Sequence, residues 1–422
     1  MKRLKLDQLI SINLYWLGLS FMWNSIHPII LPAVLIHLVP GNMKNTYLGL
    51  LTFVGLILAM IVQPVSGAAS DVWRSKWGRR RPLAVLGTSG DLLFLALLAW
   101  SGNILVVIIG YIGLQITSNI AHGPMQGLLP DLVPEDQLGS ASGMKNFMDM
   151  GGLIVASLAA GNLMPPDAKN PTLIMIVVIV VLVATAIFTF LTTHEEPSTK
   201  LVKKEKQKTN IHKIWADLRG NTTFLQFIFA RFIFLVGVYG VQTFAQYYIQ
   251  DVFQAANPVK ATGDLMAALA ISLVIFAVAA GWLTDRYGPQ IVLIVASVFS
   301  AIGSGLLIFA VNLTQVKIFG SVLGAGIGLF LTANWALASQ LAPKSEAGKY
   351  LGLTNLATAG ASAASKLFGI PIDWINRAYP GKYLGYNVLF LSGSIFALFS
   401  IIFLIYTRKR DPTKVSQEEI LN

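Results

Sequence analysis

The chain of 422 residues contains no cysteine and few charged side chains. Without cysteine, disulfide bonds are excluded, and no thiolate is available to bind a metal ion. Only 12% of the residues are charged and 55% are hydrophobic, whereas a soluble domain carries about 25% charged residues. This balance excludes an ordinary soluble protein.

Long apolar stretches take the place of the missing charges. The stretch LIMIVVIVVLVATAIFTFLTT at 173–193 holds no charge, and comparable runs of roughly 20 residues, enough to cross a bilayer as a helix, recur along the chain. The alternating pattern of barrel strands is absent, which favours helices. We therefore predict an all-α membrane protein with twelve transmembrane helices in two pseudo-symmetric six-helix bundles. The predicted spans are 9–37, 46–69, 83–101, 104–128, 139–162, 172–193, 222–250, 263–283, 289–311, 314–340, 347–372 and 384–407.

The distribution of Lys and Arg orients these spans. Basic residues crowd the N-terminus, loop 70–82, segment 194–220 and the sequence RKR at 408–410, whereas the alternate loops hold at most one or two. The positive-inside rule places the crowded loops and both termini in the cytoplasm. We attribute the net charge of +11 to this topology and not to nucleic-acid binding. The prediction is a multi-pass protein of the cytoplasmic (inner) membrane whose first span is retained, not cleaved as a signal peptide.

The longest polar stretch separates six spans from six. It predicts an N-terminal six-helix bundle at 1–193, a cytoplasmic linker at 194–220, a C-terminal six-helix bundle at 221–410 and a cytoplasmic tail at 411–422. Within the linker, IHKIWADL has the pattern of a short amphipathic helix at the membrane surface.

Two loops half a chain apart repeat one pattern. GAASDVWRSKWGRRRP follows the second span and GWLTDRYGPQIVLIV follows the eighth; each has G-x-x-[ST]-D, then a basic residue, an aromatic residue and glycine. Repetition on this scale is typical of transporters. We predict a cytoplasmic gate whose ion pairs break when the two bundles rock. The gating residues are Asp71, Gly78, Arg79, Arg80, Arg81, Asp131, Asp285, Arg286 and Gly288.

These loops, the span count and the central linker together resemble the major facilitator superfamily. A narrower resemblance comes from SDVWRSKWGRRRP at 70–82 and NIAHGPMQGLLPDLVPEDQLGSASG at 119–143. Both are similar to the sucrose-transporter and glycoside–pentoside–hexuronide symporter branch, which has S-D-x(6)-G-R-R-R-P after span two and N-x-x-x-G-P-x-x-x-L-L-x-D-L at the end of span four. The resemblance implies transport of a sugar or glycoside coupled to protons or sodium.

The chain departs from these relatives at the positions that couple transport to an ion. Gln115 stands where plant sucrose transporters carry aspartate, Gln126 stands where they carry arginine, and span two lacks the paired aspartates of the sodium-coupled symporters. The candidate coupling residues are therefore Asp91 and Asp149. Asp91 lies roughly 12 Å into span three with no obvious local partner. Asp149 follows Lys145 by four residues, a spacing that favours an internal salt bridge over a proton relay.

Polar side chains within the spans indicate a solute cavity, because such groups are costly in lipid. Span four places Gln115, Asn119, His122 and Gln126 on one helical face. Amide and imidazole groups donate and accept hydrogen bonds, which suits a neutral polyhydroxylated ligand. For each residue the alternative is a hydrogen bond between helices. The candidate substrate-binding residues are Asn24, His27, Gln63, Gln115, Asn119, His122, Gln126, Arg231, Gln242, Gln246 and Trp335; Trp23, Tyr239 and Tyr247 are further candidates to face a sugar ring.

These features predict a secondary active transporter that moves a small polar solute, a sugar or glycoside, by alternating access with proton coupling. The alternatives are an uncoupled sugar uniporter and a multidrug or metabolite efflux antiporter, although the fifth span, MDMGGLIVASLAAG, lacks the proline expected of drug antiporters. No convergent catalytic groups indicate an enzyme. We expect no cofactor and no metal, with protons as the coupling ion. The expected partners are the solute and the lipid bilayer, not nucleic acid, and we expect the protein to be a monomer.

Overall fold

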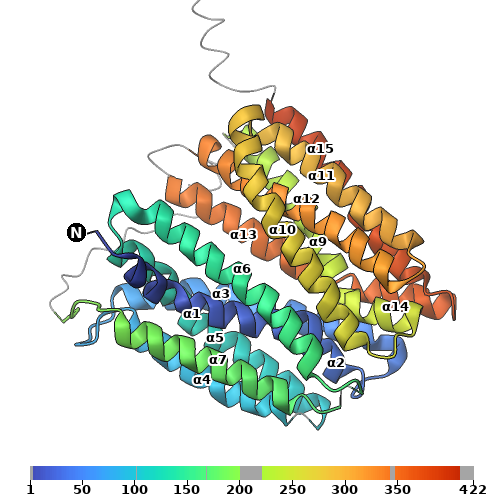
Figure 1. Ribbon diagram of the computed structural model, residues 1–422, viewed down its shortest axis with the longest axis horizontal. Helices are drawn as coiled ribbons and strands as arrows, with labels where there is room; N and C mark the ends of the chain where they lie inside the picture. The colour runs from blue at the N-terminus through green and yellow to red at the C-terminus, as the bar shows by residue number, and fades with distance from the viewer. Residues whose placement is uncertain (1–2, 101, 168, 200–220, 343–346, 409–422) are drawn as a thin grey trace, which may run out of the picture. The chain divides into compact units, whose positions relative to one another are not determined.

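The computed structural model describes residues 3–100, 102–167, 169–199, 221–342 and 347–408, and within them the chain is helical (Figure 1). The first half contains α1 (Leu6–Ser25), the π-helix η1 (Ile26–Ile30), α2 (Leu31–Leu35), α3 (Lys44–Asp71), α4 (Arg81–Ala99), α5 (Ile104–Leu132), α6 (Leu138–Leu163) and α7 (Thr172–Thr192). The second half contains α9 (Thr222–Phe253), α10 (Pro258–Tyr287), α11 (Pro289–Leu306), α12 (Leu313–Leu341), α13 (Ala347–Lys366), α14 (Gly369–Ala378) and α15 (Leu384–Arg408).

Ten helical segments in the described part of the chain are long and apolar enough to cross a membrane, α1 together with its extension to Leu35 counting as one. The remaining long helices, α6 with 26 residues and α13 with 20, are rich in Gly, Ala, Ser and other polar residues, which lowers their hydropathy. The all-α membrane fold is thus confirmed. The count of twelve spans stays a prediction.

Packing divides the chain into two compact units. Unit 1 comprises Met1–Glu205 and Phe244–Ala267, and unit 2 comprises Lys206–Thr243 and Ala268–Asn422, so that α9 and α10 contribute residues to both. The predicted boundaries between bundles, linker and tail remain a prediction, and both IHKIWADL and the tail lie outside the described residues. In unit 1, α4 packs against α5 and α7; in unit 2, α11 packs against α12 and α15. The third predicted span of each half therefore packs against the fourth and sixth.

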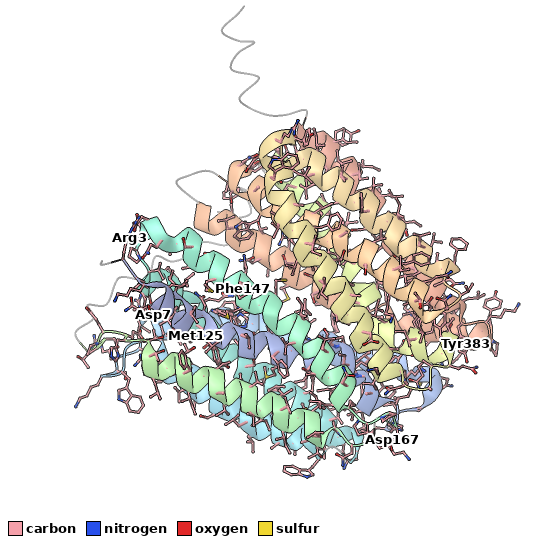
Figure 2. All side chains as sticks on the ribbon, viewed as in Figure 1. Arg3, Asp7, Met125, Phe147, Asp167 and Tyr383 are labelled. Carbon is pink, nitrogen blue, oxygen red and sulfur yellow. The ribbon has the colours of Figure 1, made fainter. Side chains whose placement is uncertain are left out.

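The N-terminus and the loop between α6 and α7 lie at opposite ends of unit 1, while the side of the membrane that each faces stays a prediction. Figure 2 shows Arg3 and Asp7 at one end of the unit and Asp167, in the loop between α6 and α7, at the other. Five predicted spans lie between the N-terminus and this loop. Because five is an odd number, helices that each cross the unit once place the two at opposite ends.

The two halves also share local backbone geometry. Asn103 and Asn312 cap the 29-residue helices α5 and α12 with nearly equal φ angles of −151° and −153°, and each side chain accepts a hydrogen bond from the backbone three residues later. Gly78 and Gly288 both have positive φ, at +92° and +83°. Each stands shortly before the next helix, α4 or α11. The repeat inferred from the loop sequences is therefore present in the backbone.

One predicted span is interrupted. The segment 347–372 was expected to form a single helix, but α13 ends at Lys366 and α14 begins at Gly369. Pro371 explains the break, because its ring has no N–H to donate and collides with the carbonyl group four residues earlier, that of Leu367.

Candidate functional site

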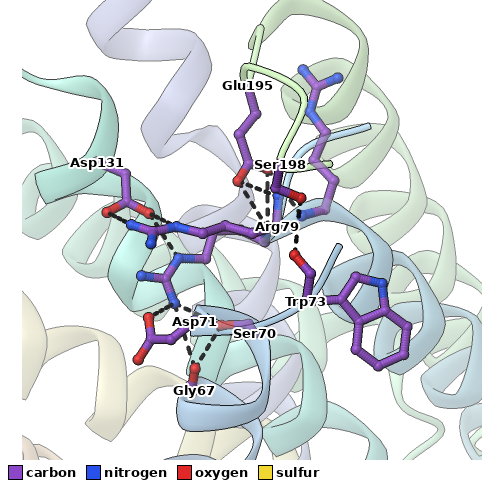
Figure 3. Close-up of polar contacts among 10 residues, drawn as sticks. Gly67, Ser70, Asp71, Trp73, Arg79, Asp131, Glu195 and Ser198 are labelled. Atoms are coloured by element: carbon purple, nitrogen blue, oxygen red, sulfur yellow. Dashed lines mark hydrogen bonds and ion pairs between the residues drawn. The ribbon is translucent and has the colours of Figure 1, made fainter. Parts of the chain in front are cut away.

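The basic loop between α3 and α4 forms an ion-pair network with the end of α5 (Figure 3). Asp131 accepts hydrogen bonds from Arg79, at 2.5 Å from Nη2 and 3.1 Å from Nε, and from Arg80 Nε at 2.8 Å. Arg80 Nη1 also lies 2.6 Å from the carboxylate of Asp71 and 2.6 Å from the hydroxyl of Ser70. The Arg80 side chain is only 8% exposed. It is the centre of the network.

Arg79 and Arg80 both bond to Asp131 but have different surroundings. The hydrogen bond to Asp131 raises the pKa of the Arg79 guanidinium above its ordinary value, since it stabilises the charged form. The Arg80 guanidinium lies against Gly127, one turn before Asp131, where any side chain would collide with it. Both arginines are fixed charges at this end of unit 1.

A carboxylate missed by sequence reasoning holds the same loop from the other side. Glu195 accepts hydrogen bonds from the backbone N–H groups of Arg79, Arg80 and Arg81 at 2.7 to 3.2 Å. The hydroxyl of Ser198 donates to the backbone oxygens of the loop and accepts from the N–H of Ser75 at 2.9 Å. The prediction treated these residues as part of a linker. In fact the segment just after α7 docks on the basic loop.

The side chains of the remaining predicted gating residues make no ion pair with this network in the described residues. The Arg81 side-chain nitrogens Nε and Nη2 are buried and have no hydrogen-bond partner in the described ranges. Asp285 is exposed and makes no salt bridge to any residue that the structure describes. The Arg286 guanidinium lies 5.3 Å from the ring centroids of Trp282 and Tyr287. A gate that joins the two halves therefore stays a prediction.

A cluster of polar side chains without a carboxylate, lysine or arginine lies in unit 1, between α5 on one side and α1 and η1 on the other. Tyr111 OH lies 2.9 Å from His27 Nε2 and accepts from Gln115 Nε2 at 2.7 Å. Asn119 donates to the backbone oxygen of Gln115 at 2.7 Å. The Trp23 indole stacks on the His27 ring, with centroids 4.8 Å apart. Three predicted residues are thus brought together: Tyr111, which the sequence analysis did not select, connects His27 to Gln115, and Asn119 bonds to Gln115.

The other half of the span-four stripe forms a separate group. Gln126 Nε2 lies 3.3 Å from His122 Nε2, and the His122 ring packs edge-on against Trp16 at 5.0 Å. Lys145 lies 4.0 Å from the Trp16 ring centroid and 2.7 Å from the carboxylate of Asp149. The predicted salt bridge between Lys145 and Asp149 is confirmed.

The other candidate residues are dispersed. Asn24 donates to the backbone and hydroxyl oxygens of Ser20 at 2.8 and 3.1 Å, within α1. Gln63 and Gln242 are half-buried, and neither side chain bonds a described residue, while Trp335 is 46% exposed. The Gln246 amide, with its nitrogen oriented toward η1, donates to the backbone oxygens of Pro28 and Ile29 at 3.1 and 2.8 Å.

Asp91 has a partner that the sequence did not reveal. The side chain is fully buried in α4, and Thr117 on α5 donates to its Oδ1 at 2.6 Å. Its second oxygen, Oδ2, has no hydrogen-bond partner in the described part of the chain. The expectation that the Asp91 carboxyl group has no local partner is therefore wrong for Oδ1, which accepts from Thr117, and holds for Oδ2.

The polar residues of unit 2 are organised around cations. Arg231 is 5% exposed and donates to the hydroxyl of Thr358 at 2.9 Å and to the side-chain oxygen of Asn334. Lys366 donates to the hydroxyl of Thr243 at 2.5 Å. Arg231 was predicted as a site residue, and its two neutral partners were not.

A buried ion pair not anticipated from the sequence closes the far end of unit 1. Lys44, at the start of α3, lies 2.5 Å from Asp251, near the end of α9; the two side chains are 8% and 14% exposed. Lys44 also lies 5.0 Å from the ring centroid of Tyr247, whose hydroxyl donates to the backbone oxygen of Pro32 at 3.0 Å. Lys44 and Asp251 are 207 positions apart in the sequence, so no local spacing predicts this ion pair. Nowhere in the described ranges do three His, Asp or Glu side chains gather in a way that could hold a metal ion.

A helical membrane protein with an internal repeat and buried polar clusters has the features of a secondary transporter. The chain matches the Major Facilitator Superfamily over residues 9–365 and belongs to that family. It is therefore a transporter and not an enzyme, as the sequence predicted.

Relatives with different cargoes are similar to this chain. The multi-drug resistance efflux pump PmrA of Streptococcus pneumoniae serotype 4 is 21% identical over 408 residues, which cover 93% of this chain and 94% of the pump. The sucrose transport protein SUT4 of Oryza sativa subsp. indica is 29% identical over 132 residues, 26% of this chain and 22% of that protein. The crystal structure of a D-xylose-proton symporter superposes with a TM-score of 0.71 at 16% identity, covering 94% of this chain and 97% of the symporter. This last likeness bears on the fold alone.

Proposed function

We propose that the chain is a secondary active transporter that moves a small polar solute, a sugar or glycoside, across the cytoplasmic membrane by alternating access. The observation that carries the proposal is the cluster of His27, Tyr111, Gln115 and Asn119 beside the Trp23 indole. These groups include no carboxylate, lysine or arginine, and their amide, hydroxyl and imidazole groups can pair with sugar hydroxyls. The flat indole suits the apolar face of a sugar ring. The similarity to a sucrose transport protein over 132 residues also supports it.

Binding to purified variants tests this function. Gln115→Ala and Asn119→Ala are expected to weaken the affinity for the transported sugar by about tenfold each, because a net hydrogen bond is worth roughly 0.5–1.5 kcal/mol and a stranded partner costs more. Asn170→Ala, which removes an exposed loop amide outside the helices, is the matched control. Loss of thermal stability without loss of sugar affinity in the two cluster variants would assign these residues to helix packing.

Multidrug efflux is the second candidate, because the match to PmrA covers 93% of the chain. A drug pump binds lipophilic compounds and does not need a ring of hydrogen-bonding groups. A thermal-shift screen of sugars, glycosides, amino acids and drugs separates the two functions. Stabilisation by drugs alone would replace the sugar proposal with efflux.

Proton coupling through Asp91 is proposed for the energy source. The carboxyl group is buried in a span, and its one described partner is the neutral Thr117 hydroxyl, so it binds a proton without losing a salt bridge. Uptake into proteoliposomes with an imposed pH gradient should be concentrative in the native chain and downhill only in Asp91→Asn. Concentrative uptake by the variant removes Asp91 from the mechanism. Its absence in the native chain makes the protein a uniporter.

The network around Arg80 is proposed to act as the cytoplasmic gate. Asp71 is 55% exposed and pairs with a buried arginine, so it is the member best placed to exchange partners during the transport cycle. Asp71→Asn should abolish uptake while leaving folded protein in the membrane. Normal uptake kinetics in this variant would contradict the assignment.

A further inference from the structure

Arg231 places a positive charge inside unit 2 without a negative partner. The side chain projects from α9 and is 5% exposed; its contacts are the Thr358 hydroxyl on α13 and the Asn334 amide oxygen on α12. Within the residues that the structure describes, no carboxylate forms a salt bridge with it. A guanidinium stays charged in proteins, and a buried charge is normally paired. In a membrane-embedded segment such a residue indicates a functional site.

The immediate surroundings include a buried hydrogen-bond donor that has no acceptor among the described residues. Asn334 is fully buried; its oxygen accepts from Arg231, and its Nδ2 donates to no described residue. The Thr358 hydroxyl accepts from Arg231 and donates its own proton to the backbone oxygen of Thr354 at 3.0 Å. The Arg231 Nη2 group likewise donates to no described residue. An oxyanion supplies the acceptors that both groups lack.

The neighbouring side chains make this position favourable for an anion. Phe234 and Phe330, one turn from Arg231 and Asn334 on the same two helices, stack with ring centroids 3.6 Å apart. This apolar contact lowers the local dielectric constant and strengthens a charge-assisted hydrogen bond. The buried cations of unit 1 contrast with Arg231, because Lys44 and Arg80 each pair with an aspartate.

We propose that Arg231 and Asn334 bind a carboxylate or phosphate group of the transported solute, which makes the solute an acidic sugar derivative. The sugar part of this inference rests on the proposed function. The anion site itself is argued from unit 2 alone. The planar guanidinium donates to two oxygens of either group, and the Asn334 amide adds a donor beside it.

Matched probes separate the charge from the sugar. The affinities of glucose, glucuronate, glucose 6-phosphate and lactate are measured by calorimetry on the purified full-length chain. Glucuronate or glucose 6-phosphate is expected to bind at least about tenfold more tightly than glucose, since hydrogen bonds to charged groups are worth more than neutral ones. The two acidic sugars distinguish a carboxylate from a phosphate.

Three variants test the residues. Arg231→Met should weaken the binding of the acidic sugar at least about tenfold more than the binding of glucose, while Arg231→Lys should keep part of the preference. Asn334→Asp places a carboxylate beside the guanidinium, so it should abolish the preference without lowering the thermal stability. Arg377→Met, an exposed arginine of the same unit, is the control expected to behave as the native chain.

The outcomes distinguish this inference from the proposed function. The anion site is overturned if glucose binds as tightly as both acidic sugars. It is also overturned if Arg231→Met lowers the affinity for all ligands equally. Neither result contradicts sugar transport. Lactate binding that depends on Arg231, with no sugar bound, supports the anion site and overturns the sugar function. If none of the acidic probes binds the native chain, the anion site is wrong.

Discussion

The loop before α4 and the loop before α11 turn through glycines of nearly equal conformation, Gly78 with φ +92° and Gly288 with φ +83°. Their charged residues behave differently. In the first loop Arg80 is buried and joins Asp71 to Asp131. In the second, Arg286 lies over aromatic rings, and no described residue pairs with its neighbouring aspartate.

The two halves therefore share the glycine backbone of this loop, whereas among the described residues the ion pairs around it belong to the first half alone. In both loops a glycine with positive φ stands just before the next helix, a backbone conformation that glycine adopts without steric cost. The ion pairs depend on an acidic residue at the end of α5 and on Glu195 after α7. By contrast, the equivalent end of α12 carries Gln340. Loops that share a sequence motif and a glycine with positive φ therefore have different electrostatic surroundings.

The largest expected effect comes from removing the central arginine. Arg80→Met should lower the free energy of unfolding by about 3 kcal/mol, because it removes the buried charge that pairs with Asp71 and Asp131 and leaves only Arg79 on Asp131. Arg286→Met, the matched change in the second loop, should cost less than about 1 kcal/mol, the value of an exposed cation–π contact. Chemical denaturation in detergent measures both values. Equal losses would show that the two loops are electrostatically alike.

Removing Glu195 should weaken only the first loop. Glu195→Ala leaves the backbone N–H groups of Arg79, Arg80 and Arg81 without their acceptor, and we expect a loss of about 2 kcal/mol. Glu195→Gln retains one oxygen and should lose about half as much. The readout is the thermal midpoint of both variants against the native chain. An unchanged midpoint in Glu195→Ala would mean that the segment after α7 does not support the loop.

Alanine substitutions at Gly78 and Gly288 should separate the backbone strain that both positions share from the contact with Glu195 that only Gly78 makes. Gly288→Ala should cost about 1–2 kcal/mol through backbone strain alone, since φ 83° with ψ 152° is a conformation that residues with a Cβ rarely adopt. Gly78→Ala should cost about twice as much, because the new methyl group also collides with the Glu195 side chain. Repeating Gly78→Ala in the Glu195→Ala background separates the two terms by a double-mutant cycle. Equal effects at both glycines in the native background would remove the contribution of Glu195.

The smallest effects should be equal in the two halves. Asn103→Ala and Asn312→Ala each remove one helix cap with nearly the same geometry, and each should cost about 1 kcal/mol. Thermal unfolding of the two single variants is the measurement. A difference larger than about 1 kcal/mol would limit the repeat to the glycine loops.

Several features of this protein follow from the sequence alone, because they depend on neighbours along the chain. Hydropathy and length predict the helices, since a backbone in lipid must satisfy its own hydrogen bonds. The salt bridge between Lys145 and Asp149 follows from a spacing of four residues in a helix. The loop motif at Asp71 and Asp285 reveals the repeat and, with it, the transporter class.

The partners of the functional side chains were decided by the tertiary structure. Glu195 reaches Arg80 from 115 residues away, Thr117 reaches Asp91 from 26, and Asn334 reaches Arg231 from 103. No spacing rule links such positions, because helices that are adjacent in space are joined by loops and by other helices. Whether a buried charge is neutralised depends on which helix faces it. The sequence placed Arg80 in a gating loop with Asp71 and Asp131 and Arg231 in a span as a substrate-binding residue, but only the packing showed that Arg80 pairs with both aspartates and that Arg231 bonds to an amide.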